Sequence, residues 1–403
     1  MRKLNAFWPV QALLGAVFAM TLHHAANAAS KPVPLRVATF NVSMEAGNYQ
    51  VDQTDKLSLA VLKAELASGK NRQIGHIAEI IQRVRPDIVL LNEFDYIEEP
   101  EQGVLQFLRN YLAVAQAEGV TAIDYPYFHI GPVNTGDPSP HDFDHDGQAT
   151  GKGGDAWGFG NYPGQYGMVV LSRYPIDGAK VRSFRQFRWR DMPGALAPID
   201  PESGQPWYSA AQWQAFRLPS KALWDLPILV AGQPLHLLAS HPTPPVFDGP
   251  EDRNGRRNHD EIRLLADYLT AAPYLYDDND SRAPFAGGRF VIVGDLNAGT
   301  QSKETYPGTM QQLLDHPLVN GSFTPTSDGG RLHTPEQAEA ASHTALWRSR
   351  ADYVLPSKAG LTVVGGGVFW PTAEAPEAYL VTDRAASSDH RLVYLDLEIT
   401  PLD

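Results

Sequence analysis

Short apolar runs rich in β-branched residues recur along the chain, and each run ends in polar residues. Six of them predict buried strands, at residues 35–40, 87–91, 166–171, 235–240, 290–293 and 390–397. Between these runs, residues 75–84 and 260–269 place apolar side chains at three- and four-residue spacing, which predicts two amphipathic helices. Strands mixed with helices indicate an α/β layered sandwich.

The domain organisation follows from what separates these elements. The sequence has no linker-like stretch after residue 30 and no internal repeat, so residues 29–403 are predicted to form a single domain. Two stretches near 120–165 and 186–226 are rich in Gly, Pro, Trp and acidic residues, and they are interpreted as loop insertions. Long loops on such a scaffold are usually where substrate selection occurs.

Polar side chains gather where the predicted strands end or begin. The clusters are Thr39-Phe-Asn41, Asn92-Glu93, Ser240-His241, Gly294-Asp-Leu-Asn297, Asp352-Tyr353 and Ser388-Asp-His390. Each cluster alone could be a turn, a helix cap or a salt bridge. Six clusters of Asn, Asp, Glu and His at the ends of buried strands instead predict one convergent site.

The order of these clusters resembles the endonuclease/exonuclease/phosphatase superfamily, which includes DNase I-like nucleases, neutral sphingomyelinases and inositol polyphosphate 5-phosphatases. The resemblance runs from about residue 35 to 397, and residues 166–176 look like the family's central strand and the turn after it. It implies a four-layer sandwich, with two packed mixed β-sheets flanked by helices and the site at one edge. It also implies hydrolysis of phosphoesters with a divalent metal ion, Mg²⁺ or Mn²⁺.

The resemblance also implies a set of metal ligands. Asn41 and Glu93 would hold the metal ion, and Asp389 would be a further ligand. Carboxylate and amide oxygens are the donors that Mg²⁺ prefers, and a chain without Cys disfavours zinc.

The remaining site residues are assigned by the same resemblance. Asp295 and Asn297 would bind and orient the attacking water. His390 would be the general base or a phosphate-stabilising imidazole, and Asp352 would fix its tautomer. His241 would donate to a phosphate oxygen or to the leaving group.

Two arginine-rich segments lie outside the resemblance. In residues 251–259, Arg253, Arg256 and Arg257 could bind a substrate phosphate, because guanidinium groups match phosphate oxygens, or could pair with neighbouring acids in a solvated loop before a helix. Residues 182–190 interleave four Arg with three aromatic residues, a pattern compatible with nucleic-acid binding. An edge strand with one aromatic face is the favoured interpretation of that segment.

An acidic segment offers a second cation site. Asp142, Asp144 and Asp146 have the spacing that begins a calcium loop, and Gly147 would allow its sharp turn. The twelfth position is Gly153 rather than Glu, which excludes an EF-hand, although Asp155 could substitute. The alternatives are a structural Ca²⁺ site and an acidic surface loop.

Charge and the N-terminal residues bear on location. Arg2 and Lys3 precede an apolar run, and residues 26–28 offer a small-residue cleavage site, so residues 1–28 are predicted to be a signal peptide of a periplasmic or secreted protein. The apolar run is shorter than the roughly 20 residues of a membrane span, and no span is expected in the mature chain. Cleavage takes two positive charges from a formal net charge of −13, which leaves −15.

These observations favour an exported, metal-dependent phosphoester hydrolase, a phosphodiesterase or a phosphatase. Its acidity argues against tight, sequence-independent nucleic-acid binding. An extracellular nuclease of the same fold remains the alternative, as does a binding module that has lost its chemistry. The expected partner is a phosphoester substrate, either a small molecule or nucleic acid, and no obligate protein partner is evident.

Overall fold

Residues 32–50, 57–400 and 402 are described by a computed structural model, in which residues 33–403 form one unit. The predicted signal peptide therefore lies outside the described residues. The strands are β1 (Val33–Met44), β2 (Ile88–Phe94), β3 (Tyr127–Ile130), β4 (Met168–Ser172), β5 (Arg182–Ser183), β6 (Leu223–Val230), β7 (Gln233–Ser240), β8 (Phe290–Asp295), β9 (Asp352–Pro356), β10 (Leu361–Val368) and β11 (Val393–Ile399). The α-helices are α1 (Leu59–Ser68), α2 (Arg72–Val84), α3 (Val104–Phe107), α4 (Ala210–Ala215), α5 (Arg253–Leu269), α6 (Gln311–Leu314) and α7 (Asp328–His333).

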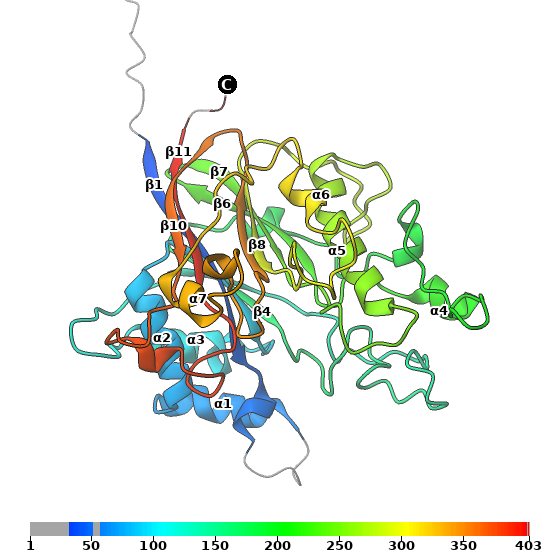
Figure 1. The fold of residues 1–403 in the computed structure, drawn as a ribbon, viewed down its shortest axis with the longest axis horizontal. Helices are drawn as coiled ribbons and strands as arrows, with labels where there is room; N and C mark the ends of the chain where they lie inside the picture. The colour runs from blue at the N-terminus through cyan, green and yellow to red at the C-terminus, as the bar shows by residue number, and fades with distance from the viewer. Residues whose placement is uncertain (1–31, 51–56, 401, 403) are drawn as a thin grey trace, which may run out of the picture. The chain divides into compact units, whose positions relative to one another are not determined.

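The strands form two mixed sheets. One has the order β10-β11-β1-β2-β4-β3, and the other has the order β5-β6-β7-β8-β9 (Figure 1). In each sheet a single central pair is parallel, β1 with β2 and β7 with β8, while the other pairs of these strands are antiparallel. The carboxyl ends of each parallel pair therefore open on one edge of their sheet, which is where the polar clusters lie.

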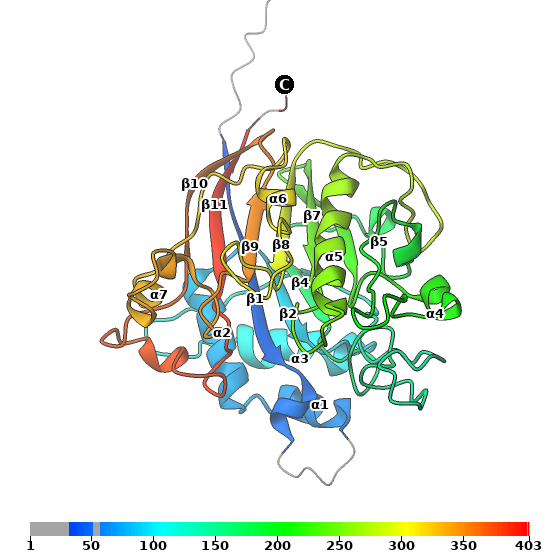
Figure 2. The ribbon, with the colours of Figure 1, turned by 45° about the vertical axis from the view of Figure 1, so that its right-hand side comes forward.

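Alternating side chains along the strands account for the layers. In β8, Val291 and Val293 belong to the apolar cluster that includes the first sheet, whereas Phe290 and Ile292 belong to the cluster that includes α5. Successive strand residues point to opposite faces, so β8 is apolar on both. Figure 2 shows α5 lying across β7 and β8.

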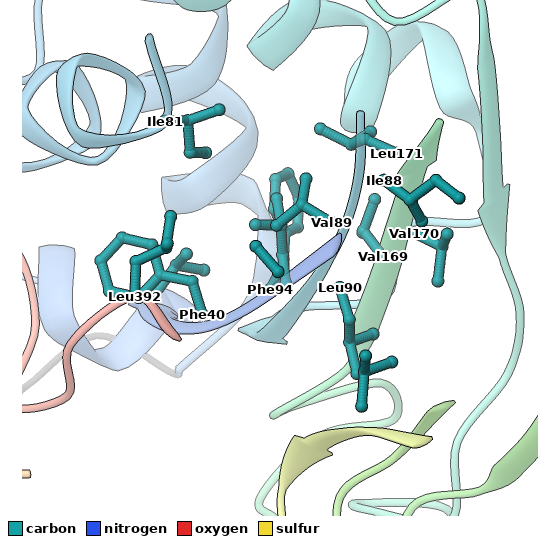
Figure 3. Close-up of a cluster of buried hydrophobic side chains, with 14 of the residues drawn as sticks. Phe40, Ile81, Ile88, Val89, Leu90, Phe94, Val169, Val170, Leu171 and Leu392 are labelled. Carbon is teal, nitrogen blue, oxygen red and sulfur yellow. The ribbon is translucent and has the colours of Figure 1, made fainter. Parts of the chain in front are cut away.

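Helix α2 covers the outer face of the first sheet. Its residue Ile81 joins Phe40 of β1 and Val89 of β2, which share one face of the sheet, in a buried cluster, part of which Figure 3 shows. Burying each such side chain contributes about 1.5–3 kcal/mol. This core has no disulfide to support it, because the chain has no Cys. The predicted four-layer, DNase I-like sandwich is confirmed.

Several element boundaries differ from those expected. The two stretches interpreted as loops contain β3, α4 and the first residues of β6. Helix α5 begins at Arg253, so the arginine-rich segment is helical rather than a loop before a helix. The last strand begins at Val393 because His390 instead bridges to Ala345. Among the described residues, no helix is both long and apolar enough to cross a membrane.

Candidate active site

The ends of the two parallel strand pairs place four of the predicted residues at the site. Asn41 lies in β1, opposite Asn92 of β2, and Glu93 follows Asn92. His241 follows the last residue of β7, and Asp295 ends β8. Gly294 is required before Asp295, because a Cβ at this position would lie 2.0 Å from the Ser240 carbonyl oxygen of β7. Close approach of β7 and β8 thus explains the glycine in this motif.

Side chains from β1, from the residue after β7 and from the loop before β11 converge on the Asp295 carboxylate at the end of β8. Its Oδ2 accepts a hydrogen bond from Asn41 Nδ2 at 3.1 Å, and lies 3.4 Å from His241 Nε2 and 3.5 Å from His390 Nε2. Burial raises the pKa of Asp295, but the charge of His390 and the hydrogen bonds from His241 and Asn41 outweigh it and hold the pKa well below its usual range. Asp295 is therefore ionised.

Asp352 and His390 form a buried pair beside Asp295. His390 Nδ1 lies 2.9 Å from Asp352 Oδ2, which also accepts a hydrogen bond from Thr344 Oγ1 at 2.7 Å. Burial lowers the pKa of His390, but Asp352 and Asp295 together raise it to about 10. Burial raises the pKa of Asp352 to about 6, against the opposing effect of His390. At neutral pH the imidazole is therefore protonated and paired with a carboxylate.

His241 is buried like His390, but its imidazole is neutral rather than cationic. Burial and the neighbouring Lys221 lower the pKa of His241 to about 4, so its imidazole is neutral at pH 7. Its Nδ1 is buried and finds no hydrogen-bond partner in the described part of the chain. The site thus presents one neutral and one cationic imidazole to the same carboxylate.

The three predicted metal ligands lie together. Asn41 Oδ1 accepts from the Ser43 backbone N–H at 3.1 Å, and Ser43 Oγ donates to Asp389 Oδ1 at 3.2 Å. Glu93 has a left-handed backbone, with φ of 56°, where β2 ends. Arg384 lies 3.9 Å from a carboxylate oxygen of both Glu93 and Asp389. Burial raises the pKa of Glu93, and the charge of Asp389 adds to this increase while His390 and Asn41 oppose it.

These oxygen donors fit a hard divalent cation, since each is a carboxylate or an amide. A second group that could hold a metal ion consists of Asp295, Asp352 and His390, whose ligand atoms lie within 4.8 Å of one another. It adjoins the first group through the hydrogen bond from Asn41 to Asp295.

Asn297 lies at the rim of the same cluster. Its backbone has φ of 52°, and its backbone N–H donates to Asp295 Oδ1 at 3.0 Å. Its side-chain Nδ2 donates to the Pro242 carbonyl at 3.2 Å. The amide is therefore held in place between β8 and the residue after His241.

Four residues at the site were not found from the sequence. Thr344 fixes Asp352, Arg384 lies between two carboxylates, and Lys221 is a buried cation beside His241. The Trp347 ring meets the His390 ring edge-on at 4.6 Å between centroids and is 49% exposed. All four residues come from loops, so they lack the strand-end pattern that identified the others.

The three arginines near the start of α5 occupy different surroundings. Arg257 is buried, and its guanidinium donates to the carbonyls of Leu218, Trp157, Arg217 and Pro219. It ties loops together and is not available for the predicted phosphate contact. Arg253 pairs with Glu251, and Arg256 lies over the Tyr306 ring at 5.7 Å.

The arginine–aromatic segment has its aromatic side chains in the core. Phe184, Phe187 and Trp189 are each at most 1% exposed. Only Arg182 and Ser183 are in a strand, β5, at the edge of the second sheet. Arg182 pairs with Asp277 at 2.8 Å. The expected edge strand is therefore limited to residues 182–183, and the buried rings leave no aromatic face for stacking bases.

The acidic segment does bring its carboxylates together. Asp142, Asp144 and Asp146 each offer an oxygen within 4.8 Å of the others. Gly147 has φ of 89°, and its N–H donates to Asp142 Oδ2 at 3.0 Å. Asp155 is instead buried, and it accepts from the N–H groups of Phe143 and Thr150, both at 2.8 Å, which closes the loop.

Comparison with known proteins agrees with this fold. The model of the endonuclease/exonuclease/phosphatase family matches residues 38–390. An endonuclease/exonuclease/phosphatase from Beutenbergia cavernae is similar in structure, with 19% identity and a TM-score of 0.50, over 92% of this chain and 72% of that one. The human Nocturnin catalytic domain has 16% identity and a TM-score of 0.44, over 91% and 95% of the two chains. At such identities the likeness shows the fold alone, and no curated protein sequence matches the chain.

Proposed function

Because the chain belongs to the endonuclease/exonuclease/phosphatase family, we propose that it is a divalent-metal-dependent phosphoester hydrolase. The observation that carries the proposal is the convergence on Asp295, where an amide, a neutral imidazole and an imidazolium from separate elements lie within 3.5 Å of one carboxylate oxygen. A site that had lost its chemistry would have no reason to keep these ionisable groups buried together with shifted pKa values.

The charge states suggest a role for each group. Asp295, which stays ionised, would orient the attacking water and accept a hydrogen bond from it. The His390 imidazolium would stabilise the negative charge that develops on the phosphate, so this role is preferred to that of a general base. Neutral His241 would donate a hydrogen bond from its one ring N–H, without proton transfer, to a phosphate oxygen or to the leaving group.

Asn41, Glu93 and Asp389 are the residues that would hold the metal ion, Mg²⁺ or Mn²⁺. Their oxygen donors match the preference of both ions, and the Glu93 carboxyl lies near the like charge of Asp389. When bound, a divalent cation there would supply Lewis-acid polarisation of the phosphoryl group. Asn41 would also link this group to Asp295 through its side-chain N–H.

The test compares three substrates with the purified protein: a chromogenic phosphodiester, a chromogenic phosphomonoester and plasmid DNA. Hydrolysis of one chromogenic substrate is expected after Mg²⁺ or Mn²⁺ is restored to chelated protein. Preferential cleavage of plasmid DNA would favour the nuclease instead, a function that the buried aromatic side chains of residues 184–189 do not support. Full activity in excess chelator, or none with any substrate and metal ion, would contradict the proposal.

The acidic segment is proposed to bind a structural Ca²⁺ ion. The support is the proximity of the Asp142, Asp144 and Asp146 carboxylates, together with the turn that Gly147 makes. Burial raises the pKa of Asp144, and the charges of the neighbouring acids add to this increase. A cation would relieve this repulsion.

Export is proposed from the sequence alone. The charged start, apolar run and small-residue site of residues 1–28 support a cleaved signal peptide. N-terminal sequencing of the protein recovered from the periplasm or medium should find a start near Ala29. An intact Met1 on the secreted protein would contradict cleavage.

A further inference from the structure

Lys221 is a buried cation that the roles above leave unused. It lies two residues before β6 and is 5% exposed. Its Nζ donates to the Pro242 carbonyl at 3.5 Å, which is its one hydrogen bond within the described residues. An ammonium group carries three donors, so two of them have no partner in the structure described.

Burying a charge without compensation is costly, so the surroundings of Lys221 matter. Burial has the largest effect on the pKa of Lys221 and lowers it, whereas the negative charges of Glu261, Glu93 and Asp295 raise it. Glu261 already accepts from the N–H groups of Ser220 and Thr243, at 3.0 and 2.9 Å, and lies 3.7 Å from Arg257. Glu261 is therefore well satisfied without Lys221.

Lys221 lies beneath the backbone of residues 241–242, next to the candidate active site. The Pro242 carbonyl that accepts from Lys221 also accepts from Asn297 Nδ2, at 3.2 Å. The preceding residue, Ser220, donates from Oγ to the His241 carbonyl at 3.4 Å. The ammonium group is thus one carbonyl away from Asn297 and adjacent to the backbone of His241.

We propose that the Lys221 ammonium group binds a non-bridging oxygen of the substrate phosphate, next to His241 and Asn297. The inference rests on the proposed function, because it needs a phosphate at this site. A phosphate oxygen would accept from one of the two free donors and compensate the buried charge. Neutral His241 would donate beside it, since two adjacent buried cations would repel each other.

The experiment measures inorganic phosphate binding in the presence of Mg²⁺, by calorimetry and as inhibition of phosphodiester hydrolysis. Lys221→Met keeps the length of the side chain and removes the charge. It is expected to weaken phosphate binding by at least about tenfold and to raise KM, as loss of a charged hydrogen bond would. Lys221→Arg should retain most of the phosphate binding. The control is Lys358→Met, an exposed lysine beyond the far end of β9, which should behave like wild type.

A merely structural Lys221 would give a different pattern. If it only balances Glu261, the double variant Lys221→Met/Glu261→Gln would recover both the melting temperature and phosphate binding, whereas our proposal expects phosphate binding to stay weak in the double variant. Unchanged phosphate binding in folded Lys221→Met, while wild type hydrolyses phosphodiesters, would overturn this inference alone. A wild-type protein that hydrolyses no phosphoester would overturn the proposed function and this inference with it.

Discussion

Replacing Asp352 with Asn and His390 with Ala, singly and together, tests whether this buried pair acts as one unit. Asn keeps the shape of the Asp352 side chain and an oxygen that can accept from Thr344 Oγ1 and His390 Nδ1. Ala at position 390 removes the imidazole. Either single change leaves the other residue of the pair in place beside Asp295.

The expected loss follows from the role of the pair. Losing one preorganised donor to the developing negative charge costs roughly 10²- to 10³-fold in rate, or about 3–4 kcal/mol at about 1.36 kcal/mol per tenfold. Each single variant should lower kcat within this range. Because both changes disable the same step, the kcat of the double variant should be scarcely lower than that of the less active single variant. The melting temperature of Asp352→Asn should change little, since a neutral imidazole can replace the imidazolium beside the amide.

The metal-free protein provides a second readout. Burial lowers the pKa of His390, and Asp352 is the largest of the opposing effects that raise it to about 10. The ionised pair should therefore persist from about pH 6, where Asp352 loses its proton, to about pH 10, where His390 loses its own. In Asp352→Asn the imidazole should titrate at markedly lower pH, which NMR of the His390 ring can follow.

The chain offers a matched control in a second buried pair. His236 Nδ1 lies 2.7 Å from Asp225 Oδ1, between β7 and β6 and away from the strand ends. Asp225→Asn makes the same substitution in a carboxylate–imidazole pair outside the site, so kcat should stay near the wild-type value.

Two outcomes would refute the reasoning about Asp352 and His390. Losses that multiply in the double variant would show that the residues act independently. An imidazole of His390 that titrates near 6.5 in wild type would show that Asp352 does not hold its charge.

Three further outcomes are expected. Glu93→Gln should raise the Mg²⁺ concentration needed for half-maximal activity, because one ligand charge is lost while the shape is kept; an unchanged metal dependence would remove Glu93 from the ligand set. Ca²⁺ should raise the melting temperature of wild type but not of Asp144→Ala, by mass action on the folded state; equal melting curves with and without Ca²⁺ would disprove that site. Arg257→Met should destabilise the fold, since carbonyls that it satisfies would be left buried; a wild-type melting temperature would contradict this structural role.

The strand-end residues could be predicted because they depend on local sequence. Asn41, Glu93 and Asp295 each follow an apolar run of one strand, and parallel strands end on one edge wherever they pair. The run therefore locates the strand, and the first polar residues after it locate the site. The same runs predicted an α/β layered sandwich, whereas its two-sheet, four-layer form was implied by the family resemblance.

The elements missed have weaker local patterns. Strand β6 contains Pro227 and the polar Asp225 within its apolar residues, and β10 contains three consecutive Gly, at 365–367. Both are strands because neighbouring strands pair with them. The start of α5 was missed because its first turn is rich in Arg and Asn, and Arg257 is buried there by contacts with loop carbonyls far away in the sequence.

The charge of each site histidine is a property that the sequence could not supply. His241 and His390 both follow a polar residue near a strand, and both lie about 3.5 Å from Asp295 Oδ2. Their other partners separate them. Against burial, Asp352 together with Asp295 raises the pKa of His390 to about 10, whereas burial together with Lys221 lowers that of His241 to about 4. One imidazole is thereby fixed as a cation and the other as a neutral donor. A phosphate bound between them would meet both forms at once without any proton transfer beforehand, which is the preorganisation that phosphoryl chemistry favours.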